Sequence, residues 1–171
     1  MTARVLITGM SGTGKSSVIE QLAALGHWAI DADSPTWSEW APMPVPGAFP
    51  GAPTELDWIW REEKMQALLD EPGPEPLFVS GCAPNQGQFH DRFDHIVLLR
   101  AAPEVIIDRV TTRTTNTFGK TAEERAKILA DPREVEPLLR AAANIEIDTG
   151  ATPLNEVVAR LVELASADRL G

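Results

Sequence analysis

Short apolar runs alternate along the chain with longer segments that have helical periodicity. Five of these runs have the length of buried strands: 4–8, 28–30, 77–80, 96–99 and 145–148. Apolar residues three or four positions apart predict helices over 15–25, 55–70, 103–110, 121–143 (with an interruption near Asp131 and Pro132) and 154–167. Strands that alternate with helices in this way predict an α/β fold built on a parallel sheet.

A change of composition marks residues 34–54. Six prolines and two glycines there predict an irregular segment rather than a helix or an interior strand. All five tryptophans of the chain lie within residues 28–60, and large aromatic side chains favour an ordered segment. Two interpretations remain open: the tryptophans line a pocket for a flat or apolar ligand, or they form a small satellite core under the loop.

The segment between the first strand and the first helix, residues 9–16, reads GMSGTGKS and matches the P-loop pattern G-x-x-x-x-G-K-S. Its glycines allow successive main-chain N–H groups to converge on a phosphate, and the helix that follows adds the positive end of its dipole. Lys15 would reach the β- and γ-phosphates of ATP, and the Ser16 hydroxyl would bind Mg²⁺. The nucleotide-binding residues expected from this motif are Gly9, Gly12, Thr13, Gly14, Lys15, Ser16 and Ser17.

Two carboxylates follow the second predicted strand. Asp31 and Asp33 lie where the carboxyl end of a parallel strand places ligand-contacting residues. One of them would hold Mg²⁺, directly or through water, and the other would accept the hydroxyl proton of a substrate. The alternative is that Asp33 or Ser34 caps a turn.

The net charge of −10 argues against general affinity for nucleic acid or an anionic membrane surface. Nine of the 15 lysines and arginines nevertheless lie between Arg92 and Arg140. This basic segment is either a solvated helical face or a lid over phosphates. Its part rich in Arg, Thr and Gly, residues 109–120, cannot bury itself and is expected to become ordered over an anion.

The 171 residues, 43% of them hydrophobic, predict a single domain over 1–171. No leader peptide is expected, and no apolar run approaches the roughly 20 residues that span a bilayer. The single cysteine, Cys82, excludes an internal disulfide and favours the cytoplasm; it is interpreted as a small buried residue rather than a nucleophile.

Taken together, the P-loop, the Asp31-Ala32-Asp33 position and the arginine-rich segment before the last strand resemble the nucleoside monophosphate kinase group of P-loop proteins, nearest to the shikimate and gluconate kinases. The resemblance covers essentially the whole chain. It implies a three-layer P-loop NTPase fold, in which helices flank a five-stranded parallel sheet of order 2-3-1-4-5. It also implies a substrate-binding insertion over 34–75 and a lid over 109–125.

Carried over by position, the resemblance makes Asp31 the Mg²⁺-side carboxylate and Asp33 the group that faces the acceptor hydroxyl. Arg61 resembles a substrate-anchoring arginine, and Gly81 lies in the corresponding substrate loop. Arg109 and Arg113 resemble arginines at the lid edge, and Thr149 lies in a loop that borders adenine. The chain departs from shikimate kinases at Ser80-Gly81-Cys82, where they carry three glycines, and at Val135, where they carry an arginine, so shikimate itself is not the expected acceptor.

These patterns predict an ATP-dependent phosphotransferase that moves the γ-phosphate to a hydroxyl or phosphate of a small molecule or nucleotide, as a monomer or homodimer. Lys15, Asp33 and Arg113 are the expected catalytic residues, with ATP and Mg²⁺ as cofactors. The alternative is an ATP-binding regulatory module with slow ATPase activity and no dedicated acceptor. A guanine-specific switch protein is disfavoured, because the sequence contains no Asn-Lys-x-Asp motif.

Overall fold

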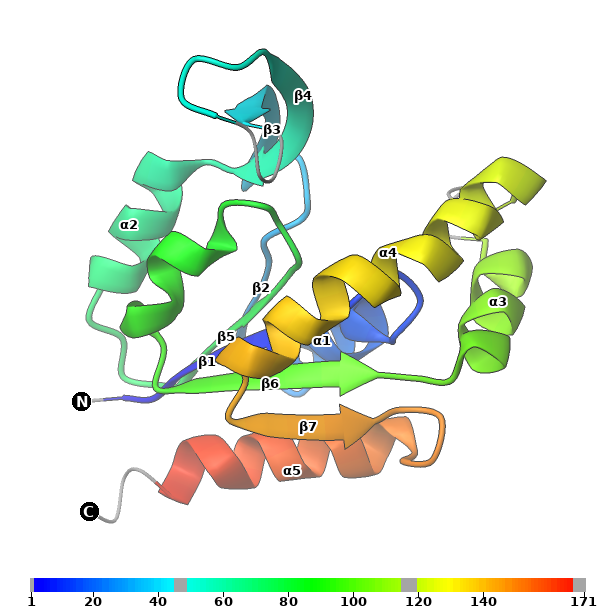
Figure 1. The fold of residues 1–171 in the computed structure, drawn as a ribbon. Helices are drawn as coiled ribbons and strands as arrows, with labels where there is room; N and C mark the ends of the chain where they lie inside the picture. Colours follow the sequence, from blue (N-terminus) through cyan, green and yellow to red (C-terminus); the bar gives the residue numbers. More distant parts are fainter. Residues whose placement is uncertain (1, 45–48, 115–119, 168–171) are drawn as a thin grey trace.

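A computed structural model describes residues 2–44, 49–114 and 120–167, apart from the side chains of residues 127–132. Five parallel strands form the central sheet: β1 (Arg4–Thr8), β2 (Trp28–Asp31), β5 (Leu77–Ser80), β6 (His95–Arg100) and β7 (Ile145–Asp148). Their order is β2-β5-β1-β6-β7 (Figure 1). When only the strands of this sheet are counted along the chain, this is the predicted order 2-3-1-4-5.

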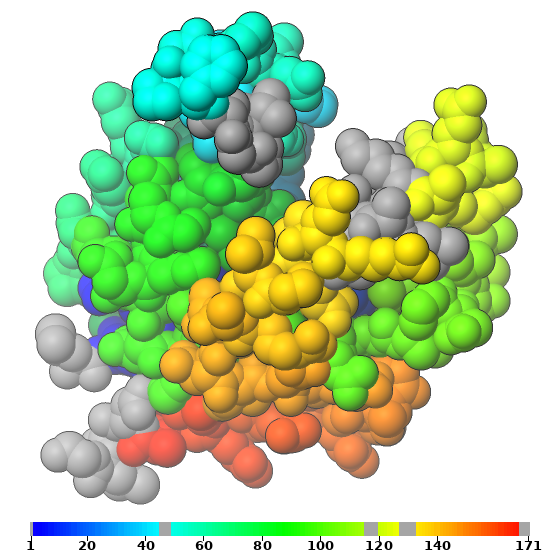
Figure 2. Space-filling view, viewed as in Figure 1, coloured from blue at the N-terminus to red at the C-terminus, as the bar shows by residue number. Residues whose placement is uncertain are grey.

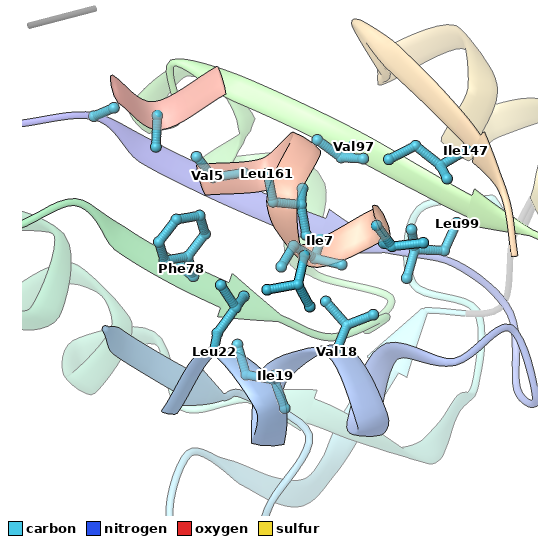
Figure 3. Packing of buried hydrophobic residues seen from close by; sticks show 14 residues of the cluster. Val5, Ile7, Val18, Ile19, Leu22, Phe78, Val97, Leu99, Ile147 and Leu161 are labelled. Carbon is cyan, nitrogen blue, oxygen red and sulfur yellow. The ribbon is translucent and has the colours of Figure 1, made fainter. Parts of the chain in front are cut away.

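Helices cover both faces of the sheet, because the β1 side chains alternate between two apolar cores. Val5 and Ile7 belong to the core beneath α1 (Lys15–Ala24) and α5 (Leu154–Ala167), which Figure 3 shows from close by. Leu6 points to the opposite core, beneath α2 (Glu62–Asp70) and the 3₁₀ helix η1 (Gln86–Arg92). This arrangement confirms the predicted three layers and places the carboxyl ends of the strands along one edge.

The segment before α2 differs from the prediction. It forms a separate two-stranded antiparallel sheet, β3 (Ser38–Pro44) and β4 (Thr54–Trp60). The prediction of an irregular segment over 34–54 was therefore wrong for residues 38–44, and residues 55–60 of the predicted helix 55–70 form a strand. Both strands of a two-stranded sheet are edges, where prolines are tolerated. The cross-strand pair Trp40–Trp58, whose ring centroids lie 5.4 Å apart, stabilises this pairing.

Two helices carry the chain from β6 to β7. The first, α3 (Pro103–Thr112), is followed by α4 (Ala122–Ala142), which begins with a capping box between Thr121 and Glu124. The predicted interruption near Asp131 and Pro132 was wrong, since α4 is continuous. Residues with high helix propensity on both sides of the proline offset its missing N–H hydrogen bond.

The hairpin β3–β4 and the first turns of α4 flank an indentation of the molecular surface, visible in the space-filling view (Figure 2). Within the described part of the chain, no helix combines the length and the apolar character that crossing a membrane requires.

Candidate active site

A cavity of about 590 Å³ lies at the carboxyl ends of β1, β2 and β5. Its lining comes from segments far apart in the sequence: the P-loop, the end of β2, the end of β5, the last turns of α3 and the region between β7 and α5. The lining residues are Ser11, Gly12, Gly14, Lys15, Ser16, Ser17, Val18, Asp31, Asp33, Ser80, Arg109, Thr112, Arg113, Thr149, Thr152, Leu154 and Val157.

The P-loop conformation depends on glycine. Gly12 has a φ of +82°, and a Cβ atom there would lie 2.9 Å from Cγ2 of Ile106, so no other residue fits without displacing α3. The helix α1 begins at Lys15, and its first α-helical hydrogen bond runs from Val18 N–H to the Gly14 carbonyl, over 3.1 Å. The N–H groups of Lys15 to Ser17 therefore have no acceptor inside the helix. They lie in the cavity wall, where an anion can accept from them.

The Lys15 ammonium lies beside the loop. It donates hydrogen bonds to the carbonyl oxygens of Gly9 and of Met10, the latter over 3.2 Å. The Thr13 side chain is buried instead, and its hydroxyl donates to the Met10 carbonyl over 2.7 Å. Gly9 and Thr13 are not part of the cavity lining, whereas the other five P-loop residues expected to bind nucleotide are.

Both predicted carboxylates line the cavity. The Asp33 N–H donates to Oδ1 of Asp31 over 3.1 Å, which fixes the turn that follows β2. Burial, and next the charge of Asp33, raise the pKa of the Asp31 carboxyl above its usual value. Ser16 and Asp31 offer the oxygen ligands that Mg²⁺ prefers, and Mg²⁺ commonly takes only one or two ligands from the protein. The described residues contain no group of three or more His, Cys, Asp or Glu side chains that could hold a metal ion.

Arg109 connects three segments of the site. Its Nη1 donates to the Gly12 carbonyl over 3.2 Å and to Oγ1 of Thr149 over 2.9 Å, and its Nη2 donates to the Thr149 carbonyl over 2.7 Å. The Thr149 hydroxyl donates in turn to the Thr13 carbonyl over 2.6 Å. Arg109 and Thr149 thus bind the P-loop to the turn after β7, which a sequence pattern cannot reveal because the partners are far apart in the chain.

Arg113 also lines the cavity, at the end of α3, and burial lowers the pKa of its guanidinium. Of the predicted lid 109–125, residues 115–119 lie outside the described residues. Lys120 donates from Nζ to the carbonyl oxygens of Thr111 and Arg113, so it binds the end of α3.

Arg61 lies apart from this cavity. It precedes α2, and its Nη1 forms an ion pair of 2.9 Å with Glu39 of β3.

Gly81 is likewise not in the cavity lining, but it adjoins Asp33: a Cβ atom at Gly81 would lie 2.8 Å from Oδ1 of Asp33. Burial raises the pKa of the neighbouring Cys82 thiol, which agrees with its interpretation as an unreactive residue.

Sequence reasoning missed several lining residues. Thr152 precedes α5, Leu154 and Val157 come from its first turn, and Ser80 comes from the last position of β5. The position of Ser80 at a strand's carboxyl end was an available signal, since Asp31 was found in this way.

Comparisons with known proteins support the P-loop fold. A family model described as an AAA domain matches residues 5–130. No curated protein sequence matches the chain. Among solved structures, a shikimate kinase from Acinetobacter baumannii in complex with shikimate is similar at a TM-score of 0.63 and 17% identity, over 100% of this chain and 97% of that one. A gluconokinase from Sinorhizobium meliloti 1021 is similar at a TM-score of 0.55 and 21% identity, over 99% and 97% of the two chains.

Proposed function

Because the chain belongs to the AAA domain family and has a P-loop fold, we propose that it is an ATP-dependent phosphotransferase acting on a small molecule or nucleotide. One observation carries the proposal. A single cavity is lined by the P-loop and Lys15, by the carboxylate of Asp33, and by the guanidinium groups of Arg109 and Arg113. Phosphoryl transfer needs little more than positioning of the two reactants and stabilisation of negative charge, and these groups supply both.

The P-loop end of the cavity would hold the ATP polyphosphate. The N–H groups at the start of α1 donate to no acceptor within the helix, and Lys15 exchanges its carbonyl partners for phosphate oxygens. Ser16 and Asp31 would hold Mg²⁺, which supplies neutralisation of the phosphate charge when bound. Arg109 and Thr149 would border the nucleotide from the side of β7.

The part of the cavity around Asp33 would hold the acceptor molecule. Asp33 accepts a hydrogen bond from the acceptor hydroxyl and orients its oxygen toward the γ-phosphorus. A bond forms between these two atoms, the bond from the γ-phosphorus to the bridging oxygen breaks, and ADP leaves while the hydroxyl proton passes to Asp33 or to water. In this proposal the Arg113 guanidinium stabilises the negative charge that develops on the transferred phosphoryl group. Residues 34–75 form the acceptor-binding insertion, and residues 109–125 form the lid.

One observation favours a second candidate, an ATP-binding regulatory module with slow ATPase activity. Arg61, the expected acceptor anchor, is paired with Glu39 outside the cavity. A dedicated module would release ADP at one slow rate whatever is added, whereas a kinase responds to its acceptor.

A metabolite screen separates the two candidates. Purified protein is incubated with Mg-ATP and single hydroxylated compounds or nucleotides, and ADP release is followed. Strong stimulation by one compound, with a phosphorylated product, supports the kinase; uniform slow release supports the module.

Arg113→Ala then tests the lid role, with Arg160→Ala as the control because Arg160 does not line this cavity. We expect Arg113→Ala to lower kcat by about 10³-fold or more while the affinity for ATP changes little. Full activity of Arg113→Ala would remove Arg113 from the mechanism.

A further inference from the structure

Two indole groups of β4 converge on Asp33. Trp58 donates from Nε1 to the Asp33 carbonyl over 2.8 Å, and Trp60 donates from Nε1 to Oδ1 of the Asp33 carboxylate over 3.2 Å. Residues two apart in a strand point to the same face, so the hairpin presents both indoles to the turn after β2. One indole therefore holds the main chain of Asp33, and the other holds its carboxylate.

A main-chain donor completes the cradle from the other side. The Cys82 N–H lies 3.1 Å from Oδ1 and 3.0 Å from Oδ2 of Asp33, so it holds both carboxylate oxygens. The approach requires Gly81, because a Cβ atom there would lie 2.8 Å from Oδ1 of Asp33 and 2.9 Å from Cζ2 of Trp60. The carboxylate, the indole and the loop after β5 thus meet with no space for a side chain at position 81.

Trp60 is itself rigidly held. Its side chain is fully buried, and its ring packs against Phe89 with the centroids 6.0 Å apart. Its main-chain N–H donates to Oδ1 of Asn85 over 3.0 Å, and its carbonyl accepts from Nδ2 of Asn85 over 2.9 Å. Asn85 therefore fixes the main chain of Trp60, and the packing around the buried ring restricts rotation of the indole away from Asp33.

We propose that Trp60 is a positioning residue that fixes the direction of the Asp33 carboxylate toward the acceptor. The effect of Trp60 on phosphoryl transfer rests on the proposed function, whereas its contact with Asp33 is independent of that function. A carboxylate has about four lone-pair positions. The Trp60 indole and the Cys82 N–H take up three of these positions, and the remaining one is left for the acceptor hydroxyl.

The sharpest test removes only the indole N–H. A tryptophan analogue in which sulfur replaces the ring N–H, benzothienylalanine, is incorporated at position 60 by codon reassignment; it keeps the shape that fills the core. We expect kcat for transfer to the best acceptor of the metabolite screen to fall about tenfold to a hundredfold, as for the loss of a hydrogen bond to a charged group. The KM for ATP should stay unchanged.

Benzothienylalanine at position 28 is the matched control, because Trp28 lies in β2, outside residues 34–75, and no hydrogen bond joins its indole to Asp33 among the described residues. A double-variant cycle adds specificity: combined with Asp33→Asn, the analogue should cost little more than Asp33→Asn alone. If the analogue leaves kcat unchanged, or if its effect on kcat adds fully to that of Asp33→Asn, then Trp60 only fills the core and the proposal is wrong.

The contact is tested separately from catalysis by the indole N–H resonances of ¹⁵N-labelled protein, with Trp60→Phe identifying the Trp60 signal. We expect Asp33→Ala to shift that signal upfield, while the Trp40 signal stays in place. An unmoved Trp60 signal overturns the proposal whether or not the protein is a kinase. If no compound in the screen accepts phosphate while the Trp60 signal does shift, the proposed function fails and the positioning of Asp33 stands.

Discussion

Replacing Thr149 by valine tests the connection between the P-loop and the sheet. The Thr149 hydroxyl accepts from Nη1 of Arg109 over 2.9 Å and donates to the Thr13 carbonyl over 2.6 Å, 136 positions earlier in the chain. Valine keeps the shape of threonine and the main-chain bond from Arg109 to the Thr149 carbonyl. The variant therefore removes a hydrogen bond from a charged donor and a hydrogen bond to a P-loop carbonyl, and with them a longer contact of 3.3 Å to the Arg100 carbonyl.

The magnitude follows from the two lost bonds. A bond to a charged group contributes about 1.5–3 kcal/mol and a neutral one about 1 kcal/mol, but Thr149 and Arg109 are only partly buried, so water replaces part of the loss. We expect the free energy of unfolding to fall by about 1–3 kcal/mol, which for a chain of this size lowers Tm by roughly 2–10 °C. Because the P-loop loses its anchor, affinity for Mg-ADP should fall as well.

Urea unfolding and calorimetric titration of Mg-ADP measure both quantities. Ser166→Ala is the control, since the Ser166 hydroxyl donates to the Val162 carbonyl of its own helix, α5, and Ser166 does not line the cavity. We expect it to change stability by less than about 0.5 kcal/mol. Equal stability and equal affinity for the two variants would refute the reasoning that Thr149 holds the P-loop in place.

Two further predictions concern the acceptor side. Gly81→Ala places a methyl group against Asp33 and Trp60, so we expect a loss of about 1–3 kcal/mol in urea unfolding and a lower kcat; wild-type values for both would contradict the close packing. The pKa of Asp31 is raised mainly by burial, so the folded form holds its proton to higher pH than the unfolded form, and stability falls as the pH rises from the unfolded pKa through the folded one. By urea unfolding, Asp31→Asn should therefore be more stable than wild type at pH 7, and no less stable below the pKa of the unfolded form. A variant less stable than wild type at pH 7 would show that ionised Asp31 does not destabilise the folded protein.

Local sequence patterns predicted the parts of the site that lie close together in the chain. The P-loop is recognisable because its glycines, Lys15 and Ser16 stand at fixed spacing between a strand and a helix. Asp31 and Asp33 could be placed in the site because the carboxyl ends of parallel strands meet at one edge of the sheet. The structure puts Gly12, Gly14, Lys15, Ser16 and both carboxylates around one cavity, whereas Gly9 is not part of its lining and Thr13 has a buried side chain.

The hairpin was missed for a physical reason. Its prolines argue against an interior strand, but a two-stranded sheet has only edges. The alternation of Leu56, Trp58 and Trp60 with polar or smaller residues was the available signal of a strand, because a period of two places them on one face. Contacts that join distant segments, such as the ion pair between Arg61 and Glu39, leave no local pattern at all.

Nucleotide binding by the P-loop is tested most directly by calorimetric titration of Mg-ATP into the wild-type protein and into Lys15→Met. We expect saturable one-site binding to the wild type, and binding weakened at least about tenfold in Lys15→Met, because one charge-assisted contact to the phosphates is lost while the fold is retained. Absence of binding to the wild type, or equal affinity in both proteins, would contradict the claim that the P-loop of this chain binds a nucleoside triphosphate.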